Sequence, residues 1–536
     1  MNTGQTFDAI VIGGGGDGLV AASVLGKAGR SVLHLVRERD AAGLAGLIDI
    51  APGYKASLGL EADWIPPLVV RELGIADMDL VAPEIPTSVA LPDGGFLSLS
   101  NRAGDAAAAI RAHSPRDATR WPAFTQTLRA LAGFLEAVYQ VPPPDLDSTA
   151  LGDLPSLLAL GRSFRSLGKA NMSELLRVMP IPAQDLVDDW FTFGPLKAAI
   201  GAAAVRDIRQ GPRSGGTSFV LLHYLAGATD GSIRGRPWLR IGVPGPDTFI
   251  ALARQSAVTH GVVIRTEAEV ARIVVRDDAV TGVRLVSGEE ISAPLVLSTE
   301  DPARTFLHLV DPAWLDPDFL LAVRNIKFRG CTAMVYYALD ALPVAPGLLN
   351  PSTALMGVVS LSTSLDVIEK AYDAAKYGNV SETLHVELSV PSLRWPELAP
   401  SGKHVLVAKV QYVPRTLRDG APWDASRSGA LADRVTAAIS RVMPAFAEVV
   451  RERLVLTPRD LEDRFGRTEG AVTSGEITLD QILFMRPVAG WGQYATPIRG
   501  LYLGGPGTHP GPGALGASGL LAARRMLADG KGRKRR

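Results

Sequence analysis

Residues 8–18 read DAIVIGGGGDG, and this stretch decides the fold. Its first five residues form a short apolar run rich in β-branched side chains, which predicts a buried strand. Four glycines in a row come next, and LVAASVLGK then spaces apolar residues as a helix does. A second apolar run, SVLHLV, occupies residues 31–36. The order of strand, glycine turn, helix and strand predicts the opening of a doubly wound α/β domain.

The glycine turn fits the pattern G-x-G-x-x-G at Gly13, Gly15 and Gly18. Gly13 allows the sharp turn out of the strand, Gly15 lets a pyrophosphate approach the backbone, and Gly18 lets the helix lie close to the strand. Free N–H groups at the start of the helix then face the phosphates. Because the pattern follows a predicted strand and opens a predicted helix, we expect these glycines to bind one dinucleotide.

The residue expected to bind the adenosine ribose is missing. A carboxylate usually stands at the end of the second strand of such a domain and accepts hydrogen bonds from the ribose hydroxyls. Here that place falls on Val36, which has no acceptor. Glu38 lies two residues further on and is the candidate that could reach back. Losing one or two such hydrogen bonds costs roughly 1–3 kcal/mol each, so we expect weakened cofactor binding.

Two later regions continue the α/β pattern. Residues 261–301 contain short apolar runs separated by turns, which predicts several strands. Residues 500–527 read as a strand, a loop rich in glycine and proline that contains Gly505 and Pro506, and a helix that opens near Leu515 and Gly516. The start of that helix is a second place for an anion or for the electron-rich edge of a flavin. We predict further strands at residues 331–339, 385–390 and 405–413, and mostly helices over residues 83–236.

Composition excludes several classes of protein. The 536 residues include 55 Lys+Arg and 55 Asp+Glu, and this zero net charge argues against bulk binding of nucleic acid. The single cysteine, Cys331, excludes an internal disulfide and a cysteine-based zinc site, and we read it as a small buried apolar residue. No uninterrupted apolar run reaches the roughly 18–20 residues that a membrane helix needs. We expect no conventional secretion signal, and the histidines show no spacing typical of a metal site.

These motifs give the chain a family resemblance. It resembles the phytoene desaturase-like flavoproteins, and within them the branch that contains the pyridine nucleotide-disulfide oxidoreductase domain 2 proteins. The most specific block is LDQILFMRPVAGWGQYATPIRGLYLGGPGTHPGPGALGASG at residues 479–519. Matching segments also include residues 8–22, 185–200 and 211–224. The resemblance implies a FAD-binding Rossmann-like domain assembled from discontinuous segments, together with an α+β substrate domain.

The resemblance also implies site residues. It places Val270 against the adenine through its backbone. His509, in the loop beside the predicted flavin edge, is a candidate for hydrogen bonding or acid–base catalysis, and Glu476 is a candidate for orienting the cofactor or substrate. The alternative for His509 is a histidine that only holds its loop, and for Glu476 a solvated or capping side chain. Trp190, Phe191 and Phe193 either line a substrate tunnel or pack in the core.

The chain departs from the family pattern at four places. Val36 replaces a glutamate, Leu44 a glycine, and Ser474 a histidine, and Pro512 interrupts a glycine-rich stretch. These departures leave two hypotheses open. The first is a FAD-dependent oxidoreductase that desaturates, saturates or isomerises an apolar isoprenoid or lipid-like substrate, with oxygen or a quinone as electron acceptor. The second is a non-catalytic binding or assembly subunit that kept the fold and lost its hold on FAD.

We expect the FAD-binding domain to comprise residues 1–80, 240–310 and 476–530, and the substrate domain residues 81–239 and 311–475. The basic end, KGRKRR at residues 531–536, is either a frayed solvated tail or a weak contact for an anionic membrane. We expect a cytoplasmic protein, with peripheral membrane contact as the alternative. Composition alone does not predict the oligomeric state.

Overall fold

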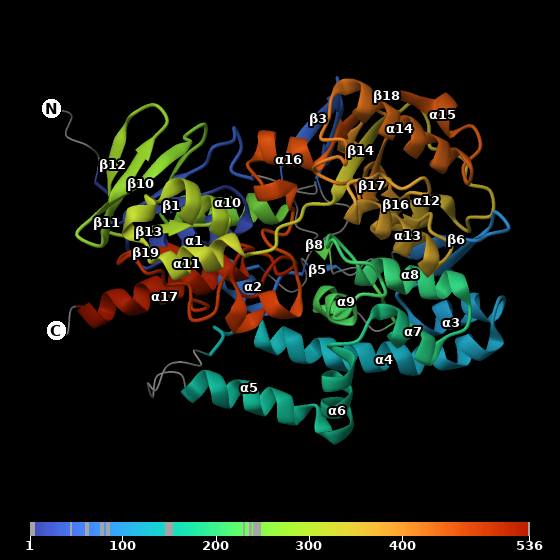
Figure 1. Ribbon diagram of the computed structural model, residues 1–536, viewed down its shortest axis with the longest axis horizontal. Helices are drawn as coiled ribbons and strands as arrows, with labels where there is room; N and C mark the ends of the chain where they lie inside the picture. Colours follow the sequence, from blue (N-terminus) through green and yellow to red (C-terminus); the bar gives the residue numbers. More distant parts are fainter. Residues whose placement is uncertain are drawn as a thin grey trace.

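The computed structural model describes residues 6–42, 46–58, 64–75, 80–81, 86–144, 154–228, 231–234, 238–239 and 248–533. Figure 1 shows two lobes side by side. One lobe carries both ends of the chain, and the other surrounds the strands labelled β14, β16, β17 and β18. Each lobe combines strands with covering helices, so the predicted α/β fold is confirmed.

A five-stranded parallel sheet forms the centre of the first lobe, in the order β19-β13-β1-β2-β9. Its strands are β1 (Ala9–Ile12), β2 (Val32–Leu35), β9 (Val263–Arg265), β13 (Val296–Ser298) and β19 (Leu501–Leu503). Ile12 pairs with both Leu35 and Ser298, so the carboxyl ends of β1, β2 and β13 meet at one edge. Ligands of open α/β sheets bind outside that edge.

Three helices cover one face of this sheet. Helix α1 (Gly16–Lys27) joins β1 to β2 and contacts both α10 (Thr248–Thr259) and α17 (Ala517–Arg533). A Cβ atom on Gly519 would lie only 2.0 Å from the carbonyl oxygen of Asp17, so glycine is required where α17 crosses α1. Helix α17 begins two residues after the predicted start and continues into the basic end, which is therefore helical through Arg533. Residues 534–536 lie outside the described ranges.

A smaller antiparallel sheet lies beside the other face. It consists of β10 (Val270–Arg276), β11 (Ala279–Leu285) and β12 (Glu290–Ser292). Asp277 and Asp278 have positive φ angles of 50° and 56° in the turn between β10 and β11, where the sequence predicted a turn. Helix α11 (Pro317–Arg324) contributes to the same apolar cluster through Phe319, Leu320 and Val323.

The second lobe is built on a seven-stranded sheet in the order β18-β14-β17-β16-β15-β6-β7. Its strands are β6 (Thr87–Ala90), β7 (Phe96–Leu99), β14 (Thr332–Leu339), β15 (Val358–Ser360), β16 (His385–Ser389), β17 (His404–Gln411) and β18 (Val450–Leu456). The strands predicted at residues 331–339, 385–390 and 405–413 are therefore confirmed. The hairpin of β6 and β7 was missed because it lies in the stretch that was predicted to be mostly helical.

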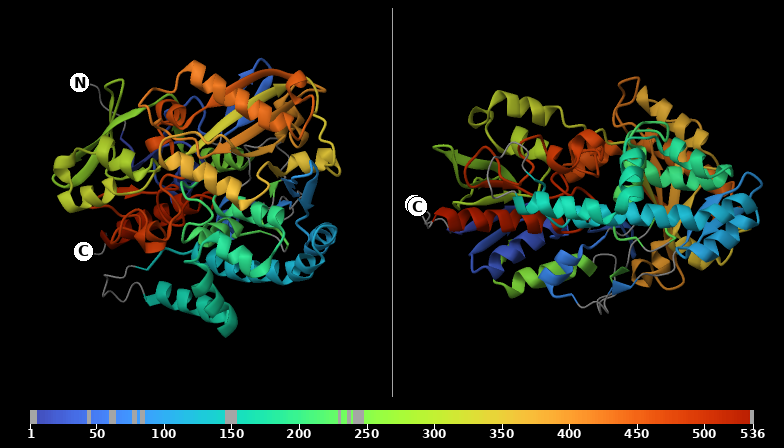
Figure 2. Two further views of the ribbon diagram at one scale, coloured as in Figure 1. Left: turned by 45° about the vertical axis from the view of Figure 1, so that its right-hand side comes forward. Right: turned by 90° about the horizontal axis from the view of Figure 1, so that it is seen from below.

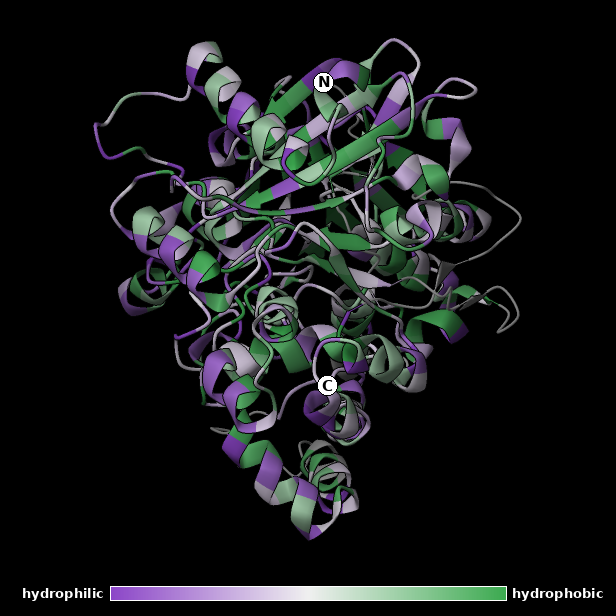
Figure 3. Cartoon of the chain, turned by 90° about the vertical axis from the view of Figure 1, so that its right-hand side faces the viewer, coloured by the Kyte–Doolittle hydropathy of each residue, from purple (hydrophilic) through white to green (hydrophobic). Residues whose placement is uncertain are grey.

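Helices make up the rest of the second lobe. They are α3 (Ala103–Arg111), α4 (Pro115–Val138), α5 (Leu154–Ser166), α6 (Gly168–Val178), α7 (Ala183–Trp190), α8 (Gly194–Ala204), α9 (Thr217–Leu225), α12 (Pro351–Met356), α13 (Leu365–Lys376), α14 (Ala425–Ser440), α15 (Phe446–Val449) and α16 (Pro458–Phe465). Figure 2 shows α4 as the long helix on the underside, with α5 and α6 projecting away from the body. Figure 3 shows hydrophobic residues along the central strands and hydrophilic residues on the outer helices. No helix in the described ranges is long and apolar enough to cross a membrane.

Short elements complete the fold. They are α2 (Pro67–Leu73), the strand pair β5 (Leu80–Val81) and β8 (Trp238–Leu239), and the hairpin β3 (Leu47–Ala51) and β4 (Tyr54–Ser57). The hairpin was assigned to the FAD-binding domain, yet Ile50, Tyr54 and Ala56 pack in one cluster with β14 and β17 of the second lobe. The predicted domain boundaries otherwise stay a prediction.

Candidate functional site

The glycine turn after β1 has the geometry of a phosphate-binding turn. Gly13 and Gly15 have φ angles of 105° and 101°, which favour glycine. A Cβ atom on Gly15 would meet only the carbonyl oxygen of Ala42, at 3.8 Å, so the space in front of this residue is open to a ligand among the described residues. The first N–H groups of α1 have no acceptor inside the helix and carry the positive end of its dipole. Such a turn can hold a pyrophosphate.

His34 on β2 supports the turn from behind. Its Nε2 donates a hydrogen bond of 2.8 Å to the carbonyl oxygen of Gly13. Burial lowers the pKa of His34 to about 4, so the ring is neutral at physiological pH. A Cβ atom on Gly18 would lie 2.8 Å from the same Nε2, and this contact explains why the third glycine of the motif is needed. The role of Gly18 in close packing is thus visible as a contact with His34.

Asp17, inside the glycine motif, ties α1 to α17. Its Oδ1 accepts a hydrogen bond of 2.9 Å from the N–H of Gly519 in the first turn of α17. Burial raises the pKa of Asp17 to about 6, while the backbone hydrogen bonds from Gly519 and Ser518 oppose this rise. The carboxylate is therefore engaged with α17.

We expect Asp17→Asn to stabilise the protein at neutral pH. The folded state binds the proton of Asp17 more tightly than the unfolded state, so stability falls as pH rises from about 4 to 6. Asparagine keeps an oxygen acceptor for Gly519 and carries no charge. Urea denaturation should show a gain of roughly 1–3 kcal/mol near pH 7 that disappears near pH 4. Asp105→Asn, on the exposed first turn of α3, is the control; a pH-independent effect of Asp17→Asn would contradict the assignment.

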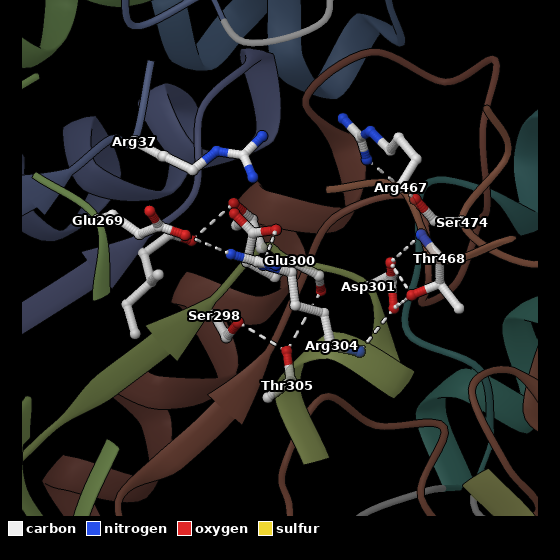
Figure 4. Close-up of polar contacts among 12 residues, drawn as sticks. Arg37, Glu269, Ser298, Glu300, Asp301, Arg304, Thr305, Arg467, Thr468 and Ser474 are labelled. Carbon is white, nitrogen blue, oxygen red and sulfur yellow. Dashed lines mark hydrogen bonds and ion pairs between the residues drawn. The ribbon is translucent and has the colours of Figure 1, made fainter. Parts of the chain in front are cut away.

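The ribose end of the site lacks its usual carboxylate, as the sequence predicted. Val36 is fully buried, and its backbone N–H bonds to the carbonyl oxygen of Arg265. Gly43 and Leu44, where another departure was noted, lie outside the described residues. Glu38 pairs with Arg37 at 3.1 Å, and 29% of its side chain is exposed. Figure 4 shows that Arg37 and Arg467 approach a group of carboxylates from opposite sides.

The loop between β19 and α17 contains Gly505, Pro506, Leu515 and Gly516, the residues predicted to bind the cofactor from this side. A Cβ atom on Gly505 would lie 2.6 Å from the carbonyl oxygen of Thr299, so this loop crosses the end of β13 closely. The N–H of Leu515 bonds to the carbonyl oxygen of Trp64 at 2.8 Å. A Cβ atom on Gly516 would lie 2.9 Å from Val20 of α1. These residues converge beside α1, and their contact with a cofactor stays a prediction.

Arg486 organises this region, and the sequence analysis missed it. Its guanidinium donates to six backbone carbonyl oxygens, those of Thr473, Ser474, Gly475, Glu476, Gln481 and Pro506. The side chain is buried, and burial lowers the pKa of Arg486 to about 10, so it remains charged at neutral pH. One side chain thus holds residues 473–476 against the loop at Pro506. A single arginine has no motif around it that would have revealed this role.

His223 on α9 holds the same loop at a second point. Its Nε2 donates to the carbonyl oxygen of Pro512 at 2.7 Å, and its Nδ1 accepts from the hydroxyl of Tyr139 at 2.7 Å. Pro512 was noted as a departure from the family pattern. Its carbonyl oxygen gives the loop a fixed contact with the second lobe.

His509 is buried in this loop. Its Nε2 donates to the carbonyl oxygen of Val138 at 3.2 Å, and its Nδ1 is buried without a partner among the described residues. Burial lowers the pKa of His509 to about 4. The ring is therefore suited to accept a hydrogen bond at Nδ1 rather than to carry a proton at neutral pH. Its catalytic role stays a prediction.

Glu476 is fully buried, so the alternative of a solvated side chain is wrong. One carboxylate oxygen accepts from the N–H of Arg209 at 2.7 Å, and the other pairs with Arg329. Both oxygens are therefore engaged in holding other segments in place. A catalytic role for Glu476 stays a prediction.

The remaining candidates are Val270 and three aromatic residues of the second lobe. Val270 begins β10, where its buried side chain belongs to the apolar cluster of that lobe. Phe191 and Trp190 pack against Phe124 of α4, with ring centroids 4.9 Å and 5.5 Å apart, and Phe193 stacks on His113. This arrangement is the core packing that was weighed against a tunnel. Cys331 is buried, and the described ranges hold no group of three or more metal-binding side chains.

Comparison with known proteins places this geometry in a family. Residues 214–527 match the family described as flavin containing amine oxidoreductase. The chain is 31% identical to pyridine nucleotide-disulfide oxidoreductase domain-containing protein 2 of Rattus norvegicus, over 98% of this chain and 94% of that protein. It is 24% identical to a lycopene-forming phytoene desaturase of Paracoccus sp., over 97% of each chain. An oxidoreductase from Methanosarcina mazei has the same fold, with a TM-score of 0.59 and 15% identity over 97% of this chain and 99% of that one.

The described residues fit the cofactor of that family. The open space at Gly15, the free N–H groups of α1 and the carboxylates at the sheet edge suit the pyrophosphate and the adenosine of FAD. The same family match and relatives show that the chain is an oxidoreductase. The chain belongs to the flavin containing amine oxidoreductase family, and its cofactor is FAD.

Proposed function

We propose that this flavoprotein oxidises, reduces or isomerises an apolar isoprenoid or lipid-like molecule. The observation that carries the proposal is the pair of apolar helices α8 and α9. All nine residues of α9 are buried, and so are most of those of α8. His223 links α9 to the loop at Pro512, and α8 contacts β6 of the seven-stranded sheet. The helices α8 and α9, which lie between the loop at Pro512 and the seven-stranded sheet, are therefore predominantly apolar.

Apolar side chains suit an apolar substrate energetically. Burial of apolar surface stabilises a complex by about 25 cal/mol per Å², so a long hydrocarbon would gain most of its affinity from contact with such side chains. Phytoene desaturases of Cereibacter sphaeroides and of Paracoccus sp., which are named for an isoprenoid substrate, are among the relatives of the chain. Their names support the same substrate class here.

The chemistry comes from the cofactor, and the protein supplies position and a dry surrounding. A bound FAD would supply the acceptor or donor of a hydride at a substrate carbon. Arg486 keeps the loop at Pro506 in place, and the neutral His509 offers its Nδ1 as an acceptor. The electron acceptor, a cytoplasmic location and membrane contact stay predictions from the sequence.

A second candidate is a substrate with a polar end, and one feature of the sheet favours it. Arg234 and Glu387 form an ion pair whose side chains are only 4% and 3% exposed. His385, next to them along β16, has a buried Nε2 without a partner among the described residues. Such groups suit a hydroxyl, carboxyl or amine on the substrate.

Anaerobic reduction of the bound flavin distinguishes these candidates. We expect an isoprenoid hydrocarbon, such as limonene in detergent, to bleach the oxidised flavin or to be recovered as an isomer. Bleaching by retinol alone would favour the polar-ended substrate, because retinol adds only a hydroxyl to an isoprenoid chain. Bleaching by cyclohexylamine alone would contradict an isoprenoid substrate. A flavin that dithionite reduces but no compound changes would favour the non-catalytic subunit.

A further inference from the structure

The structure places a different carboxylate where the ribose acceptor is missing. Glu300 lies two residues after β13, the strand on the other side of β1 from β2. Because these three strands are parallel, residues after β13 reach the same sheet edge as Val36 and Glu38. A carboxylate from β13 can therefore approach the glycine turn from the opposite side.

Glu300 lies against that turn. A Cβ atom on Gly13 would be 3.1 Å from Oε1 of Glu300 and 2.6 Å from Oγ1 of Thr299. Thr299 is fixed there, because its N–H and its hydroxyl both donate to the carbonyl oxygen of Ile12, at 2.8 Å and 2.9 Å. The first glycine of the motif thus makes room for the segment that carries Glu300. Glu38 is not among the atoms nearest to Gly13.

The carboxylate of Glu300 is held by one oxygen and retains the other for a ligand. Its Oε2 pairs with Nε of Arg304 at 3.3 Å, and its Oε1 has no hydrogen-bond partner among the described residues. One quarter of the side chain remains exposed, so a ligand can reach it. Figure 4 shows Glu300 at the centre of the group, between Arg37, Arg304 and Arg467.

Nearby charges act on Glu300 in both directions. Burial raises the pKa of Glu300, and the carboxylates of Asp301 and Glu38 add to this rise, whereas Arg304 and Arg467 lower it. Two hydroxyl donors from a ribose would stabilise the ionised form, as hydrogen bonds to a carboxylate do. Asp301 is already satisfied, because it accepts from Thr468 and from the N–H of Arg304.

We propose that Glu300 binds the adenosine ribose of FAD and replaces the carboxylate missing at Val36. This inference concerns the cofactor only and does not depend on the proposed substrate. It also revises the sequence prediction, which gave this contact to Glu38.

The first test measures how tightly the full-length protein holds FAD. Fluorescence of released FAD, followed on dilution of the holoprotein, gives Kd. We expect Glu300→Gln to raise Kd about 10-fold to 100-fold, which is the effect of losing one or two charged hydrogen bonds. Glu38→Gln is the matched control and should change Kd by less than about threefold. The reverse pattern, or an unchanged Kd in Glu300→Gln, would overturn the proposal.

A second readout separates a ribose contact from a merely structural role. The wild-type chain should bind FAD more tightly than an analogue whose adenosine carries a 2′-deoxyribose, and Glu300→Gln should lose this preference. An equal loss of affinity for both compounds would overturn the proposal. Val36→Glu should restore FAD binding in the Glu300→Gln background and add little to the wild-type chain. A large gain from Val36→Glu alone would show that the ribose has no carboxylate at present, even if Glu300→Gln fails to fold.

Discussion

Gly15→Val should abolish flavin binding while leaving the fold intact. Gly15 has a φ angle of 101°, which a β-branched residue adopts only under strain, and its side chain would project into the space left open at the start of α1. That space is where the pyrophosphate of a dinucleotide approaches the backbone. Binding weakened by more than about 3 kcal/mol corresponds to a loss of more than a hundredfold in affinity. The flavin released from purified protein by heat is the measurement.

Gly29→Val is the control for backbone strain. Gly29 also has a positive φ angle, of 78°, in the turn after α1, and a Cβ atom there would meet nothing within 4 Å. Both variants carry a β-branched residue in a left-handed conformation, but only Gly15 faces the predicted pyrophosphate. Gly29→Val should therefore keep its flavin. Unchanged flavin content in folded Gly15→Val would refute the placement of the cofactor.

Arg486→Leu should cause the largest loss of stability of any variant considered. Leucine would leave five backbone carbonyl oxygens, those of residues 473–475, 481 and 506, without a donor among the described residues, in a region where Arg486 is only 2% exposed; the sixth, that of Glu476, still accepts from Gln481. Uncompensated buried acceptors cost about 1–3 kcal/mol each, and although such costs do not add fully, we expect a loss of about 4 kcal/mol or more. Chemical denaturation, monitored by circular dichroism, gives the free energy of unfolding.

Arg486→Lys and Arg499→Leu complete this test. Lysine keeps the charge but has three donors in place of the planar guanidinium, so Arg486→Lys should recover only part of the loss. Arg499 is exposed and its guanidinium donates to a single carbonyl oxygen, that of Asp277. Arg499→Leu should therefore change stability by less than about 0.5 kcal/mol. Equal effects of Arg486→Leu and Arg499→Leu would show that the carbonyl contacts do not stabilise the fold.

Patterns within short stretches of sequence predicted those elements whose conformation depends on neighbouring residues alone. The strand, glycine turn and helix at residues 8–27 are readable because a positive φ requires glycine and a buried strand requires an apolar run. The strands β14 and β17 contain apolar runs and were predicted for the same reason, whereas β16 alternates polar and apolar residues as a strand does. The hairpin of β6 and β7 was missed because Thr87 and Ser88 are polar, so the segment does not read as an apolar run. Its place in the sheet also depends on pairing with β15, which lies far away in the sequence.

Contacts between distant segments could not be predicted in this way. Glu300 reaches Gly13 only because β13 pairs with β1, and Asp17 meets Gly519 only because α17 crosses α1. Arg486 and His223 act on carbonyl oxygens, which have no signature in the sequence. His509 and Glu476 were predicted as candidates for catalysis, and the structure shows hydrogen bonds that hold segments together at both.

The amount of FAD bound per chain tests the central claim most directly. The wild-type protein, saturated with FAD and freed of excess ligand, should carry one flavin per polypeptide, as measured by the visible spectrum and by flavin released on heating. Gly15→Val, treated in the same way, should carry none, and Gly29→Val should match the wild type. A wild-type protein that takes up no FAD, or a folded Gly15→Val that binds as much as the wild type, would contradict a FAD site at this glycine turn.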